Sequence, residues 1–222
     1  MKKILSALAM LLLALSAYAD GTILFSTAQG GIDVAPYRIP GITCGYGGRL
    51  IASVGRLVCG TDSGFGRVDC VVKISTDNGA TWSEREIEAA VGDASLINNV
   101  KTPMAAAYGD PAIVMDRESH EVLMMAVAGC TVYGYASTNR HNPNLIAAIR
   151  SMDGGLTWQQ PIEQTEAIYG LFDQTHPIDA AFVGGGKIFQ SRVVKVGRYY
   201  RIYAALTARP KGNRVIYSDD FG

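Results

Sequence analysis

The sequence predicts an all-β protein built from a repeated four-stranded unit. Residues 75–82 (Ser-Thr-Asp-Asn-Gly-Ala-Thr-Trp) return as residues 151–158 (Ser-Met-Asp-Gly-Gly-Leu-Thr-Trp), and residues 218–222 begin a third copy. Short β-branched and aromatic runs, bounded by turn residues, recur in the same order around each copy. Because such a unit buries its apolar face only against its neighbours, the pattern indicates a β-propeller.

The expected strands follow the repeat. In the first unit they are residues 39–44, 49–56, 69–75 and 81–87. In the second unit they are residues 111–115, 121–128, 145–151 and 157–162. The third unit offers residues 188–196, 199–206 and 213–218. We therefore expect two complete propeller blades and a third without its last strand.

The octapeptide falls each time between the third and fourth expected strands. Its Asp and Gly suit a tight turn, and its Ser and Thr can bond the local backbone. Its Trp is expected to pack between neighbouring units. A turn that recurs in every unit cannot mark one unique site, so we expect its aspartates to be structural.

The connections between expected strands differ in length from one face to the other. The octapeptide turns and the other short connections are expected at one face, and the long ones at the opposite face. The long connections are residues 57–68, 88–109, 129–144 and 163–187. Long loops on a rigid scaffold are where binding and catalysis usually occur, so we expect the functional site at this second face.

The N-terminus has the pattern of a secretory signal peptide over residues 1–19. Lys2 and Lys3 precede an apolar run, and Ala17-Tyr18-Ala19 forms a small-residue cleavage pattern before Asp20. No later stretch is long and apolar enough to span a bilayer. We expect an exported chain of residues 20–222, periplasmic or extracellular.

Charge and cysteine content narrow the function classes. The formal net charge is +0, and removal of the two signal lysines leaves the mature chain near −2, which excludes the basic field of a nucleic-acid-binding protein. Four cysteines in an exported chain allow three full pairings, among which the sequence does not choose. Neither cysteines nor histidines have metal-ligand spacing, so we expect no metal and no cofactor.

Three polar side chains stand at equivalent positions near the starts of the expected innermost strands: Arg38, Asp110 and Gln190. Charged groups are rarely buried without a partner. Either Arg38 pairs with Asp110, or these groups meet a ligand.

The octapeptide is similar to the Asp box, and Tyr37-Arg38-Ile39-Pro40 resembles the Arg-Ile-Pro motif that opens the catalytic domain of bacterial sialidases (neuraminidases). The resemblance runs from Tyr37 to the third octapeptide. It implies a six-bladed propeller of which residues 20–222 supply about the first half. It also implies a glycoside hydrolase, an exo-alpha-sialidase that removes terminal sialic acids from glycoproteins or glycolipids with retention, through a tyrosine nucleophile.

The resemblance assigns roles to five residues. Arg38 corresponds to the first of three arginines that grip the substrate carboxylate, and Asp62 to the acid/base aspartate. Arg56 and Asp110 would contact the sugar near its 4-hydroxyl, and Gln190 would line the pocket. Asp69 competes with Asp62 as the acid, but it opens a strand beside the octapeptide, which favours Asp62.

The tyrosine nucleophile, its glutamate partner and the other two arginines have no matching motif before Gly222. We therefore expect the 222-residue chain alone to be inactive. Two other readings stay open: a non-catalytic sialic-acid-binding propeller, and an Asp-box glycosidase that acts on another glycan.

Overall fold

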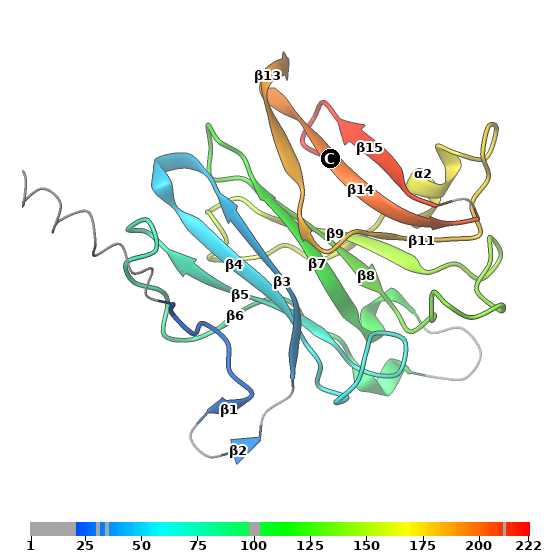
Figure 1. Ribbon diagram of the computed structural model, residues 1–222, viewed down its shortest axis with the longest axis horizontal. Coiled ribbons are helices and arrows are strands. Elements are labelled where there is room, and N and C mark those ends of the chain that lie inside the picture. The colour runs from blue at the N-terminus through cyan, green and yellow to red at the C-terminus, as the bar shows by residue number, and fades with distance from the viewer. Residues whose placement is uncertain (1–20, 30–31, 34–35, 98–102, 211) are drawn as a thin grey trace, which may run out of the picture.

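The computed structural model describes residues 21–29, 32–33, 36–97, 103–210 and 212–222. The expected signal peptide, residues 1–19, lies outside the described residues. A small hairpin of β1 (Ala28–Gln29) and β2 (Ile32–Asp33) precedes three small sheets. Figure 1 shows the second sheet, in green, between the first sheet in blue to cyan and the third in orange to red.

The first and second sheets are antiparallel meanders. The first contains β3 (Tyr37–Cys44), β4 (Leu50–Arg56), β5 (Asp69–Ser75) and β6 (Ile87–Ala90), in that order. The second contains β7 (Tyr108–Met115), β8 (Val122–Ala128), β9 (Leu145–Ser151) and β10 (Ile162–Glu163). A short strand, β12 (Gly186–Lys187), pairs in parallel with β7. The repeated strand order expected from the sequence is confirmed, although the fourth strands begin about five residues late, because the octapeptide turn extends past its Trp.

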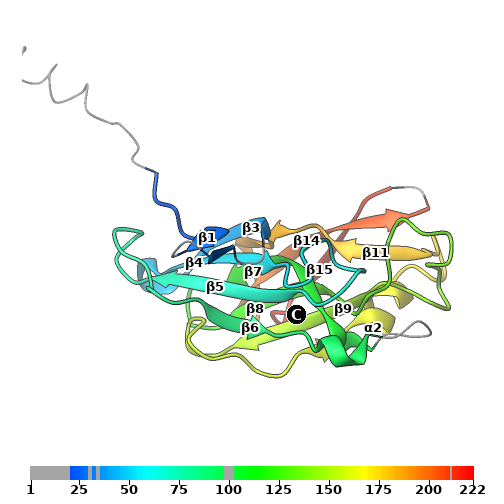
Figure 2. The ribbon, with the colours of Figure 1, turned by 90° about the horizontal axis from the view of Figure 1, so that it is seen from below.

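The third sheet contains β11 (Ala180–Val183), β13 (Phe189–Val196), β14 (Tyr199–Arg209) and β15 (Arg214–Ser218). The expected strand 188–196 is found as β13, but a further strand, β11, precedes it in this sheet and was not expected. β11 and β13 both pair with β14, separated by a break at residues 184–188. The expected loop 163–187 therefore contains β11, β12 and the helix α2 (Thr165–Gly170), which lies beside the second and third sheets (Figure 2).

Three 3-10 turns also occur among the described residues. They are η1 (Tyr46–Gly48), η2 (Ala94–Leu96) and η3 (Met104–Ala106). In the described residues, no helix is long and apolar enough to cross a membrane.

Apolar side chains fill the spaces between adjacent sheets. One cluster joins the first and second sheets, and includes Ile51, Ile74 and Ile149. Trp158 of the second octapeptide packs against this cluster, so the expected position of that Trp between neighbouring units is confirmed. A second cluster, with Leu123, Ile188 and Leu206, joins the second and third sheets. Each sheet thus buries its face against the next, as expected of repeated units.

The three octapeptide copies form the same turn. The Ser218 hydroxyl donates to Asp220 Oδ1 over 2.5 Å, and the other two copies make the same bond over 2.8 Å, from Ser75 to Asp77 and from Ser151 to Asp153. In the first copy, hydrogen bonds from Thr81 and Ser75 lower the pKa of Asp77 to about 2. These aspartates are engaged in closing their own turns, which supports the structural role expected for them.

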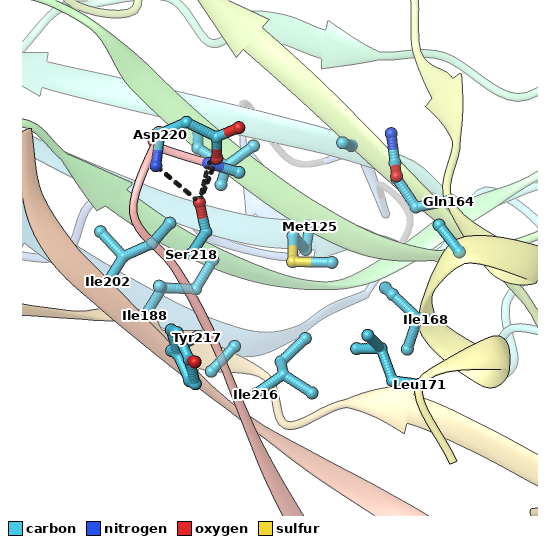
Figure 3. Close-up of a pocket in the computed structure, with 15 residues that line it drawn as sticks. Met125, Gln164, Ile168, Leu171, Ile188, Ile202, Ile216, Tyr217, Ser218 and Asp220 are labelled. Carbon is cyan, nitrogen blue, oxygen red and sulfur yellow. Dashed lines mark hydrogen bonds between the residues drawn. The ribbon is translucent and has the colours of Figure 1, made fainter. Parts of the chain in front are cut away.

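An apolar cavity of about 450 Å³ lies between α2, the second sheet and β15 (Figure 3). Its walls include Met125, Ile168 and Ile216, and its polar edge is the Ser218–Asp220 turn. The backbone of Gly222 packs closely against the Leu123 side chain. Gly155, in the second octapeptide, packs in the same way against Ile51 of the first sheet. The cavity is therefore a feature of packing between repeats, and it lies away from the charged residues considered next.

Candidate functional site

The candidate site lies where β3 and β7 begin, at the sheet ends opposite the octapeptide turns. Each strand is irregular there: the register of β3 shifts between Arg38 and Gly41, and that of β7 shifts between Gly109 and Ala112. Ile39 and Asp110 have φ values of +55° and +50°, a conformation that costs energy for residues other than glycine. Two neighbouring strands thus carry the same strained irregularity beside the same site.

Arg38 and Asp62 form an ion pair at this end of the molecule. Arg38 Nη1 donates to Asp62 Oδ2 over 2.9 Å, and the two side chains are 50% and 45% exposed. Asp62 comes from the loop between β4 and β5, where its Oδ1 accepts from the Ser63 amide over 2.9 Å. Of the two alternatives for Arg38, pairing with Asp110 is not what the structure shows, since Asp62 holds the guanidinium.

Asp110 lies close enough to this pair to sense both charges. Burial raises the pKa of Asp110, the neighbouring Asp62 raises it further, and Arg38 opposes the shift. Within the described part of the chain, no side chain donates a hydrogen bond to its carboxylate. Arg38, Asp62 and Asp110 are thus brought together, although the chain separates them widely.

A cavity of about 200 Å³ adjoins Asp62 and Asp110. Its remaining walls are largely apolar and include Val132, Tyr133 and Phe182, the last two rings meeting edge to face at 4.9 Å. Asn144 also lines it: this side chain is 2% exposed, its Nδ2 donates to the Thr131 carbonyl, and its Oδ1 is buried without a partner. The long loops 57–68 and 129–144 converge here, as their length led us to expect.

Arg56 lies on β4 opposite Tyr37, the neighbour of Arg38, and its side chain is bound by carboxylates. Its guanidinium donates to Asp69, Glu86 and Glu88. Asp69, which is 0% exposed, also accepts from Arg67 and from the Gly92 amide over 2.9 Å. Asp69 therefore has no free acceptor position aimed at the cavity, which supports the preference for Asp62 as the acid.

Gln190 is not at this site, and its expected place in the pocket is corrected. Its side chain is 6% exposed, its Nε2 donates to Asp116 Oδ1 over 2.6 Å, and its Oε1 accepts from the Arg117 amide over 3.0 Å. These partners follow the end of β7, roughly 20 Å from Asp110 at about 3.3 Å per strand residue. The prediction failed because it started the third sheet too late in the sequence. The strand that lies near Asp110 is β11, and its Phe182 lines the cavity in the place expected for Gln190.

Sequence reasoning missed Phe182 and Asn144. Phe182 was assigned to a loop, although the apolar run 180–183 could have indicated a strand. In the described residues, no group of three His, Cys, Asp or Glu side chains could hold a metal ion.

The sequence was compared with those of known proteins. A curated protein described as a sialidase from Micromonospora viridifaciens is 28% identical over 194 residues, which is 84% of this chain and 28% of that protein. The chain thus spans less than a third of that relative. No protein-family model matches the sequence.

Solved structures share the fold. A Hadza microbial sialidase matches with a TM-score of 0.68 and 23% identity, over 89% of this chain and 38% of that one. The leech intramolecular trans-sialidase matches with a TM-score of 0.66 and 16% identity, over 96% of this chain and 46% of that one. The intramolecular trans-sialidase from Ruminococcus gnavus has a TM-score of 0.66 and 15% identity, over 93% and 63%. With the repeated turns and the Tyr37-Arg38-Ile39-Pro40 motif, these matches show that the chain is similar in sequence to a sialidase and shares the fold of part of the sialidase structures.

Proposed function

We propose that this chain supplies part of the active site of an exo-alpha-sialidase, which hydrolyses terminal α-linked sialic acids with retention. The three sheets would be successive blades of a six-bladed propeller. The observation that carries the proposal is the Arg38–Asp62 pair beside Asp110 and the cavity, on the face opposite the octapeptide turns. The substrates would be sialylated glycoproteins or glycolipids met outside the cytoplasm, after export.

Arg38 would bind the carboxylate of the sugar. A guanidinium can grip a carboxylate through two parallel hydrogen bonds, and Arg38 already holds the Asp62 carboxylate. An exposed pair of this kind contributes only about 0–1 kcal/mol, so a substrate carboxylate can replace Asp62 at low cost.

Asp62 would be the general acid and then the general base. When the substrate carboxylate takes the place of Asp62 on Arg38, the Asp62 carboxyl group is released to face the glycosidic oxygen. A protonated Asp62 can donate to the departing glycosidic oxygen and later accept a proton from water. Binding of the substrate carboxylate and release of the Asp62 side chain from Arg38 would thus be one event.

Tyr37, the tyrosine next to Arg38, is not placed to serve as the nucleophile. Tyr37 donates to Glu86 over 2.5 Å, and burial, with this hydrogen bond next, raises the pKa of Tyr37 to about 12. Its phenol is held protonated, the opposite of an activated nucleophile. We therefore propose that the 222-residue chain binds sialosides without hydrolysing them.

The test combines binding with turnover. The purified chain is titrated with the α-methyl glycoside of sialic acid and with its carboxyl methyl ester, and is incubated with a fluorogenic aryl sialoside. We expect binding of the acid, much weaker binding of the ester and no release of the fluorophore. Arg38→Ala should remove the preference for the acid.

Two results would count against the proposal. Equal affinity for acid and ester, or for a neutral glycoside, would favour a glycosidase that acts on another glycan. Turnover that Asp62→Ala abolishes would show that the described residues already suffice for hydrolysis.

A further inference from the structure

Each of the two loops that border the cavity carries a half-buried cysteine. Cys59 lies in the loop 57–68, which carries Asp62 and is called the Asp62 loop below. Cys130 lies in the loop 129–144, which supplies Val132 and Tyr133 to the cavity wall. Both cysteines pack against one small apolar cluster of Leu57, Val68 and Ala107. Two strand connections that are distant in sequence thus place their thiols against the same cluster.

Gly66 lies between these two cysteines. Cys130 Sγ is 3.7 Å from the Gly66 carbonyl oxygen, and a Cβ added to Gly66 would lie 2.5 Å from Cys59 Cβ. Burial raises the pKa of Cys130, and the neighbouring Cys59 raises it further, so the two thiols are within electrostatic range. Only the absence of a side chain at Gly66 permits this approach.

The other two cysteines are placed differently. Cys44 is exposed at the far end of β3, beside η1. Cys70 is 0% exposed between the first and second sheets, where its thiol donates to the Tyr108 carbonyl over 3.5 Å. The structure therefore favours a bridge between Cys59 and Cys130, and it leaves Cys44 and Cys70 apart as thiols, so none of the three full pairings that the sequence left open is favoured as a whole.

We propose that Cys59 and Cys130 form an oxidative modification site, at which a disulfide ties the Asp62 loop to the cavity wall. The oxidant is a small-molecule disulfide, for example oxidised glutathione. One cysteine thiolate attacks it, forms a mixed disulfide and releases one glutathione thiolate. The second cysteine thiolate then attacks the protein sulfur and releases the other. Two protein thiols lose two electrons and two protons, and one glutathione disulfide becomes two glutathione thiols.

The experiment uses the purified 222-residue chain, incubated with oxidised glutathione at pH 8 to 9. Free thiols are counted, and a proteolytic digest without reductant is analysed by mass spectrometry. We expect the four thiols per chain to fall by two, with a peptide pair linked through Cys59 and Cys130. The link closes a long loop, so the unfolding midpoint should rise by roughly 5–10 °C and fall again on reduction.

Matched variants identify the pair. Cys59→Ser and Cys130→Ser should each abolish the linked peptide and the thermal shift, whereas Cys44→Ser should change neither. Circular dichroism checks that each variant is folded. A link through Cys44 or Cys70, or glutathione adducts without a link, would overturn the proposal. None of these measurements involves a sugar, so the result is independent of the proposed sialidase function.

Discussion

The two ends of the sheets use carboxylates in opposite ways. At the octapeptide end, Asp153 accepts hydrogen bonds from Ser151, Leu156 and Thr157 of its own turn. At the cavity end, Asp62 is half exposed in a single ion pair, and Asp110 is strained in backbone and has a raised pKa. Repeated and fully bonded polar groups build the fold, whereas unique and incompletely bonded ones mark the candidate site.

Asp69 shows that position alone does not make a carboxylate functional. It lies at the cavity end of β5, yet two arginines and a backbone amide occupy its oxygens. The number of bonds that a carboxylate already makes separates the structural group from the available one.

Substitution of an arginine at each end of the sheets should give the largest difference, which is in sialoside affinity. Arg38→Ala should weaken binding of the α-methyl sialoside by about 10–100-fold, because hydrogen bonds to a charged group contribute about 1.5–3 kcal/mol. Its thermal stability should stay unchanged, since the Arg38 pair is exposed. Calorimetric titration and thermal unfolding measure the two effects.

Arg49→Ala is the matched control at the octapeptide end. Arg49 Nη1 donates to the carbonyls of Asp153 and Gly154 over 3.1 and 3.2 Å, which joins the first sheet to the second turn. Its loss should lower stability by roughly 1 kcal/mol and leave binding intact. The proposed difference between the two ends would be wrong if Arg38→Ala were the less stable variant and Arg49→Ala the weaker binder.

Substitution of an aspartate at each end should give a smaller difference, which is in the free energy of unfolding. Asp153→Ala should lower the free energy of unfolding by about 1–2 kcal/mol, whereas Asp62→Ala should change it by less than about 1 kcal/mol. Burial alone would raise the pKa of Asp153, but its hydrogen bonds from Thr157 and Ser151 lower it. The stabilisation by Asp153 is therefore present above about pH 4 and is lost as the pH falls further.

Chemical denaturation at pH 7 and at pH 3 measures both quantities. The deficit of Asp153→Ala should be large at the higher pH and should shrink at the lower one. A deficit that does not depend on pH would mean that the turn needs the shape of the side chain rather than its charge.

The smallest effect is expected at Asp110, with the opposite sign. Its raised pKa means that ionisation destabilises the fold, so the penalty is absent below about pH 4 and grows as the pH rises through the folded-state value. Asp110→Asn keeps a residue that tolerates positive φ and removes the charge. We expect a small gain in unfolding midpoint at pH 7 and none at pH 3.5. A loss at pH 7 would show that the carboxylate stabilises the folded state.

The sequence predicted the fold better than the site. Third strands β5 and β9 match their expected bounds, because the octapeptide that follows each one marks its end. Gln190 was misplaced because the third sheet breaks at residues 184–188, and a break that depends on pairing with β14 leaves no local pattern. Phe182 was missed although its short apolar run, residues 180–183, is a local signal for a strand.

What the sequence determined by itself is what repeats along it. The octapeptide sets the strand order, the turn chemistry and the face that carries the long loops, because those depend on neighbouring residues. The tertiary structure alone decided which groups meet: Arg38 pairs with Asp62 rather than Asp110, and Cys59 approaches Cys130 across Gly66. Those contacts depend on how separate loops fold over packed sheets, and the chain has no local signal for them.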